Sequence, residues 1–103
     1  KKKHLLEIQK LQDDLAQWSD QQFGHNRPPI RPINHLKREI DELSEAPNDP
    51  MEYADCLLLL IDAFRMAGGN ADELVEFGFK KLAINRQRKW GKPDAHGVTE
   101  HIE

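Results

Sequence analysis

The sequence predicts an all-α protein, a bundle of about four helices, from three observations. Apolar residues recur at spacings of three and four positions along several segments, as on one face of an α-helix. Glycine and proline concentrate between these segments, where they act as breaks. No segment alternates apolar and polar residues as a half-buried strand does. The 103 residues suffice for one domain with one small core, so we expect a single domain over 1–103 that ends in a polar tail at 91–103.

The first helix is predicted over residues 3–22. Its apolar stripe has helical spacing and consists of Leu5, Ile8, Leu11, Leu15 and Trp18. We expect the helix to end at Phe23 and Gly24, because glycine is a natural helix stop. The proline-rich segment 27–32 follows. Because proline disrupts a helix interior, this segment is predicted to be an extended connector.

The second and third helices are predicted on either side of a short break at residues 47–49. The second begins at Ile33 or Asn34 and runs to Ala46. Asp49 is a suitable N-cap and Pro50 a suitable first residue for the third helix, which then continues to position 67 before two glycines. Because the connection is short, the two helices should form an antiparallel hairpin. A fourth helix is expected from position 70 or 72 to about position 90, with an irregular or only briefly helical tail after it.

Composition narrows the class of function. The net charge is −3, whereas a general nucleic-acid binder is usually basic, so we expect no nucleic acid polymer as a partner. No apolar run is long enough to cross a bilayer, and the single cysteine, Cys56, allows no disulfide framework. We expect a cytoplasmic protein without a membrane partner, in which Cys56 is a small core residue.

Four carboxylates form two matched pairs, Glu39 with Glu42 and Glu52 with Asp55. Each pair is spaced i, i+3, which places both acids on one face of a helix. The second pair opens the most apolar stretch of the chain, where like charges repel and desolvation is costly. A hard divalent cation such as Mg²⁺ would offset both penalties. The pairs therefore predict a metal site beside the hairpin turn, with ordinary solvated helix faces as the alternative.

Other polar residues extend this hypothesis. Lys81, Asn85 and Arg88 are spaced i, i+4, i+7, so we expect one helical stripe that could contact phosphates, or else a solvated basic helix end. His35 lies one turn before the first acidic pair and is predicted to be a structural hydrogen-bonding residue. Asp62 could orient a metal ligand or form a salt bridge between helices.

Several motifs in order resemble the MazG-like all-α nucleoside triphosphate pyrophosphohydrolases, and most closely the phage-type dATP/dGTP diphosphohydrolase branch. The resemblance covers nearly the whole chain and includes the two acidic pairs as an ExxE…ExxD signature. The further matching motifs are Trp18-Ser19, Phe23-Gly24, His35-Leu36-Lys37-Arg38-Glu39, Lys81…Asn85…Arg88-Lys89-Trp90 and His101-Ile102. One departure is Arg38, where the wider family has an acid; this leaves the number of metal ions open.

The resemblance implies a Mg²⁺-dependent enzyme, with Mn²⁺ as a substitute, that hydrolyses dATP or dGTP to the monophosphate and pyrophosphate. It implies metal binding by Glu39, Glu42, Glu52 and Asp55, with a catalytic base among Glu39 and Glu42. It also implies substrate binding by Lys81, Asn85, Arg88, Trp18 and Phe23. The helical bundle would be completed by oligomerisation as a homodimer or homotetramer.

Two alternatives remain open at this point. The first is a housecleaning pyrophosphatase for dUTP, dCTP or modified nucleotides, because a single sequence does not define the contacts to the base. The second is a non-catalytic helical interaction module whose acids bind a cation.

Overall fold

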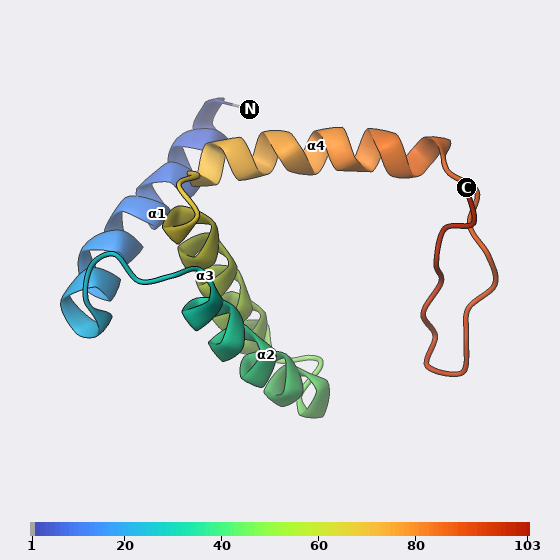
Figure 1. Cartoon of the computed structure of the whole chain (residues 1–103), viewed down its shortest axis with the longest axis horizontal. Coiled ribbons are helices and arrows are strands. Elements are labelled where there is room, and N and C mark those ends of the chain that lie inside the picture. The colour runs from blue at the N-terminus through green and yellow to red at the C-terminus, as the bar shows by residue number, and fades with distance from the viewer. Residues whose placement is uncertain (1) are drawn as a thin grey trace.

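The computed structural model describes the backbone of residues 2–103 and the side chains from Glu7 onward, so the predicted role of Leu5 lies outside the described side chains. Four helices follow one another, α1 (Lys2–Phe23), α2 (Ile30–Glu45), α3 (Pro50–Met66) and α4 (Ala71–Gln87), as Figure 1 shows. Within residues 2–103 the only β-structure is an isolated antiparallel bridge between Trp90 and His101. The prediction of an all-α protein is confirmed.

Helices α2 and α3 form the expected hairpin and lie side by side (Figure 1). Asp49 is the N-cap of α3, where its side chain accepts a hydrogen bond of 2.9 Å from the Met51 N–H. Pro50 is the first residue of the helix, a position at which its missing N–H costs no hydrogen bond. The hairpin thus brings both acidic pairs to the region of one turn.

Helix α2 begins earlier than predicted, at Ile30, so the extended connector is shorter than 27–32. The prediction failed because it treated Pro32 as a helix breaker. Pro32 stands in the first turn of α2, where backbone N–H groups have no intrahelical acceptor and proline is tolerated. Its ring is buried.

Helix α4 ends at Gln87, earlier than the predicted position 90. Arg88 has an extended conformation, with φ −85° and ψ 153°. The Trp90 indole Nε1–H donates to the Asn85 carbonyl at 2.9 Å and so satisfies one of the free carbonyls at the helix end. The tail then folds back on itself, and the Ile102 N–H donates to the Lys89 carbonyl at 2.7 Å. This pairing replaces the last helical turn that the sequence suggested.

The apolar core is small and lies where α1, α3 and α4 meet. Its buried members are Leu15, Ile61 and Ala71, against which Ile8, Leu58 and Leu74 pack. Two members of the predicted α1 stripe stay outside the core, since Leu11 is 37% and Trp18 52% exposed. Cys56 is only half-buried, so its predicted place in the core is wrong.

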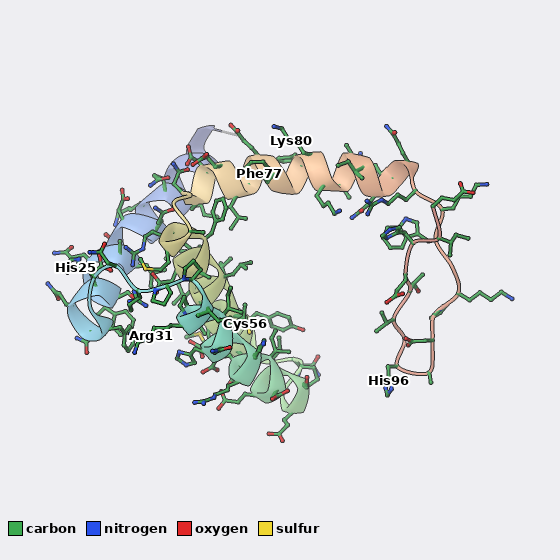
Figure 2. All side chains as sticks on the ribbon, viewed as in Figure 1. His25, Arg31, Cys56, Phe77, Lys80 and His96 are labelled. Atoms are coloured by element: carbon green, nitrogen blue, oxygen red, sulfur yellow. The ribbon has the colours of Figure 1, made fainter. Side chains whose placement is uncertain are left out.

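Much of α4 extends away from the other helices (Figure 1). The radius of gyration of the chain is 15.7 Å, whereas a compact chain of this length should have about 13 Å. Side chains along the extension are apolar and exposed, Phe79 by 67%, and Figure 2 shows Phe77 on this helix. The other large apolar residues there are Leu82 and Ile84. A single chain therefore leaves apolar side chains on more than one side of this helix without cover.

A buried ion-pair network joins α1, the connector and α3. Asp62 Oδ2 accepts hydrogen bonds from Ser19 Oγ at 2.8 Å and from Arg27 Nη2 at 3.1 Å. Asp62 Oδ1 accepts from Arg65 Nη2 at 2.7 Å, and Arg65 also makes two hydrogen bonds to Asp20, of 2.9 and 3.2 Å. Of the two predicted roles of Asp62, the salt bridge between elements is the one that these contacts confirm.

Asp62→Ala is expected to lower the free energy of unfolding by about 3–5 kcal/mol, because it leaves two guanidinium groups without their buried partner. Urea denaturation followed by circular dichroism measures this loss. Asp14→Ala is the matched control. Its ion pair with Lys10 is exposed and screened by solvent, so the loss in this variant should be much smaller. Equal losses in the two variants would contradict a special role for the buried network.

Candidate active site

Three carboxylates from the two halves of the hairpin converge. Glu39 on α2 and Glu52 and Asp55 on α3 each offer one oxygen atom, and these atoms all lie within 4.8 Å of one another. Glu42 is outside this group of three but close to it, since its negative charge helps to raise the pKa of both Glu39 and Glu52. The structure thus places all four predicted acids together, with Glu42 at the edge.

The proton equilibria of the cluster show how costly its negative charge is. Hydrogen bonding of protonated Glu39 to Glu42, then burial, then the charges of Glu42 and Asp55 raise the pKa of Glu39 above its ordinary value, while His35 opposes them. Burial first, followed by the charges of nearby acids, raises the pKa of Glu52. A positive charge at the cluster would relieve both groups.

The chemistry of the donors fits a hard divalent cation. Glu39 Oε2 and Glu52 Oε2 are buried, and neither has a hydrogen-bond partner among the described residues. A buried carboxylate oxygen without a donor carries an uncompensated desolvation cost. Oxygen ligands of this kind are those that Mg²⁺ prefers. His35 fulfils the structural role predicted for it, because its Nε2 lies 3.2 Å from Glu39 Oε1.

A cavity of about 160 Å³ adjoins the carboxylates. Its lining includes Trp18 and Phe23 from α1 together with Glu39 from α2 and Asp55 from α3. The two aromatic rings meet edge to face, with centroids 5.6 Å apart. The structure therefore brings the two predicted aromatic residues next to the acidic group, as a site for a flat base beside a polyphosphate would require.

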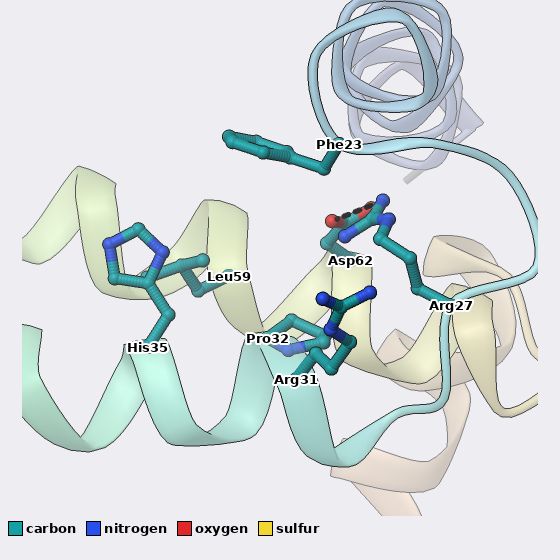
Figure 3. A pocket seen from close by; sticks show the side chains of 7 residues that line it. All are labelled: Phe23, Arg27, Arg31, Pro32, His35, Leu59 and Asp62. Atoms are coloured by element: carbon teal, nitrogen blue, oxygen red, sulfur yellow. Dashed lines mark hydrogen bonds and ion pairs between the residues drawn. The ribbon is translucent and has the colours of Figure 1, made fainter.

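Phe23 also lines a second cavity, of about 200 Å³ (Figure 3). In this view the Phe23 ring extends from the end of α1 into the space above α2 and α3. Arg27 points toward Asp62, and His35 lies at the opposite end of the cavity from Arg27. Phe23 is thus a shared wall between the two cavities.

The polar residues of the predicted phosphate-binding stripe lie away from the carboxylate cluster of the same chain. Lys81 and Asn85 are on α4, and Arg88 follows the end of that helix, so the predicted continuous helical stripe is broken at Arg88. Helix α4 contacts α1 and α3 but, among the four described helices, not α2. The C-terminal part of α4 also extends away from the α2–α3 hairpin (Figure 1), so within one chain these three residues do not meet the carboxylate cluster.

The sequence predicted no role for Ser19 or Arg27. Ser19 and Arg27 both bond to Asp62, which lies on a different helix far along the chain. No spacing pattern links such distant positions. The hints in the sequence were Arg27 at the start of a proline-rich segment, Ser19 within a family motif, and the possible salt bridge of Asp62.

Known proteins share this arrangement. A solved structure with a TM-score of 0.77 and 34% identity covers 93% of this chain and 97% of its own. It is described as the Cyanophage S-2L MazG-like pyrophosphohydrolase bound to dGDP and three catalytic Mn²⁺ ions per active site. Four helices with an acidic cluster between α2 and α3 define the chain as a MazG-like nucleotide pyrophosphohydrolase. Residues 11–103 match the dATP/dGTP pyrophosphohydrolase family, and the chain belongs to that family.

Curated relatives come from phages. The dATP/dGTP diphosphohydrolase of Cyanophage S-2L is 36% identical over 97 residues, which is 92% of this chain and 88% of the relative. The Eaa protein of Salmonella phage P22 is 37% identical over 97 residues, but the match covers only 30% of its length. The dATP/dGTP diphosphohydrolase of Salmonella phage PMBT28 is 32% identical, over 31% of its length. None of the described helices is both long and apolar enough to span a membrane.

Proposed function

We propose that this chain hydrolyses dATP or dGTP to the nucleoside monophosphate and pyrophosphate in the presence of Mg²⁺, with Mn²⁺ as a substitute. The observation that carries the proposal is the convergence of three carboxylates, two of them with unpartnered buried oxygens, beside an aromatic-lined cavity. Membership of the dATP/dGTP pyrophosphohydrolase family supports the same reaction.

Glu39, Glu52 and Asp55 would hold the metal, and Glu42 would complete the set from the edge. A bound divalent cation supplies positive charge for the triphosphate and lowers the pKa of coordinated water. The pair Glu39 and Glu42 would provide the general base that takes the proton of the attacking water.

Trp18 and Phe23 would stack against the base. Both rings are about half exposed, at 52% and 51%, and both line the cavity that Glu39 and Asp55 also line. Stacking on aromatic side chains stabilises a bound base by about 1–3 kcal/mol. A purine offers more ring area to such a wall than a pyrimidine does, which favours dATP and dGTP over dUTP and dCTP.

Lys81, Asn85 and Arg88 would reach the triphosphate of a neighbouring chain in a homodimer, or in a homotetramer built from dimers. The residues are remote from the carboxylates of their own chain, and the helix that carries them exposes the apolar residues Phe77 and Phe79. A second copy of the chain would cover exposed apolar side chains of α4 and bring basic groups to the acidic site. Closed two-fold pairing generates two equivalent sites of this kind.

A panel of nucleoside triphosphates with Mg²⁺, scored for monophosphate and pyrophosphate, tests the proposal. Release of pyrophosphate from dATP and dGTP above the other substrates is the expected result. Preferred turnover of dUTP, dCTP or a modified nucleotide would instead identify a housecleaning enzyme. Lack of turnover with every substrate, under both Mg²⁺ and Mn²⁺, would favour the non-catalytic module. For a phage-encoded chain like its relatives, the reaction would take place in the host cytoplasm.

A further inference from the structure

A buried guanidinium group packs against the aromatic ring of Phe23. Arg27 is only 8% exposed, and its Cζ lies 5.5 Å from the centroid of the Phe23 ring. Phe23 itself is the last residue of α1 and is half exposed. A side chain at a helix end with so little apolar cover would otherwise sample several rotamers.

Arg27 donates three hydrogen bonds. Its Nη2 donates to Ser19 Oγ at 2.8 Å and to Asp62 Oδ2 at 3.1 Å, while its Nε donates to the carbonyl oxygen of Gly24 at 2.9 Å. Gly24 directly follows Phe23 and has φ +90°, so the chain turns sharply at this point. The three bonds therefore connect the corner after Phe23 to both α1 and α3.

The joint between α1 and α3 does not depend on Arg27 alone. Arg65 pairs with Asp62 Oδ1 and with Asp20, and so already links the two helices. What Arg27 adds is the bond to the Gly24 carbonyl and the contact with the Phe23 ring. Arg27 therefore contributes mainly to the position of Phe23, the aromatic residue that lines both cavities.

We infer that Arg27 is a positioning residue for nucleoside binding: through Ser19, Asp62 and Gly24 it holds the Phe23 ring in place against the base. This inference rests on the proposed function, because it takes Phe23 as a stacking surface for a purine. It assigns to Arg27 no contact with the triphosphate or the metal.

Equilibrium binding of dGDP in the presence of Mn²⁺, measured by calorimetry, provides the test. Phe23→Ala should weaken binding about 10-fold, in line with the loss of one stacking contact. Arg27→Lys keeps the charge near Asp62 but loses the planar fork, and should weaken binding about 3-fold to 10-fold. In the double variant, Arg27→Lys should have no further effect, because Phe23 is no longer there to be positioned. The affinity for Mn²⁺ alone should stay the same in all of them.

Arg31→Lys is the matched control, since Arg31 lines the second cavity but makes none of the three bonds that define the role of Arg27. Its effect, whatever its size, should add to that of Phe23→Ala. Ser19→Ala offers a second route if Arg27→Lys does not fold, and it should likewise weaken dGDP binding only when Phe23 is present.

Additive effects of Arg27→Lys and Phe23→Ala, or equal weakening of Mn²⁺ binding, would overturn the inference while leaving the proposed function intact. Failure of the unmodified protein to bind dGDP at all would overturn both. In turnover assays, a rise in KM with an unchanged kcat supports the positioning role, and a fall in kcat alone contradicts it.

Discussion

Glu39→Gln is expected to lower pyrophosphate release by roughly 10²–10³-fold, because it removes a charged group that electrostatic catalysis would require at the metal centre. The same change should raise the melting temperature of the metal-free protein. Glu39 stands among like charges, and Glu42 and burial raise its pKa. A neutral amide at this position relieves that repulsion. A pyrophosphate-release assay measures the first effect, and differential scanning fluorimetry with and without Mn²⁺ measures the second.

The stability gain should depend on pH in a defined direction. A carboxyl whose pKa is raised by folding stabilises the protein below its ordinary pKa of 4.5, and that contribution is lost as pH rises through the higher folded value. The advantage of Glu39→Gln over the unmodified protein should therefore be small at pH 4 and grow above it. An advantage that shrinks with rising pH would contradict the assignment of charge repulsion at Glu39.

Glu42→Gln separates base catalysis from metal binding. Glu42 lies at the edge of the cluster, outside the group of three carboxylates. If it serves as the base, its replacement should lower kcat strongly while Mn²⁺ still raises the melting temperature. Glu39→Gln should lose both properties. Unchanged turnover of Glu42→Gln would remove Glu42 from the catalytic pair.

Two inactive variants are expected to restore activity when mixed. Glu39→Gln lacks a metal ligand, and Lys81→Ala lacks a phosphate contact that we place in the neighbouring chain. After subunits exchange, half of the dimers are mixed, and each mixed dimer holds one intact site and one doubly defective site. Activity should return to roughly a quarter of that of the unmodified protein, as closed two-fold pairing requires.

The control for this experiment is a mixture of Glu39→Gln with Asp55→Asn, whose two changes fall in the same cluster of one chain. This mixture should stay inactive. Light scattering should give at least a dimer. A monomer, or a first mixture as inactive as the control after exchange, would contradict a site shared between chains.

The features that the sequence predicted well are those encoded locally. Asp49 and Pro50 gave the start of α3 because capping depends on adjacent residues. The acidic pairs could be placed together because a short turn forces two neighbouring helices into a hairpin. Local patterns thus sufficed for the fold class and for the centre of the site.

The features that escaped prediction depend on contacts between distant segments. The Trp90 side chain donates a hydrogen bond to the Asn85 carbonyl where α4 ends early, and helix propensity does not predict this interaction. Ser19 and Asp62 carry no sign in the sequence that they meet. The remote position of Lys81 follows from the direction in which α4 leaves the core, which no periodicity encodes.

The short turn between α2 and α3 has a consequence for how the enzyme would assemble. All the carboxylates of the cluster fall within residues 39–55, so their association needs only contacts of small sequence separation, which form rapidly during folding. The basic groups would arrive only through association of two chains, a step whose extent depends on protein concentration. Mn²⁺ affinity should therefore stay constant on dilution, whereas nucleotide affinity should fall. A dilute, newly made chain would be loaded with metal before it could recognise its substrate.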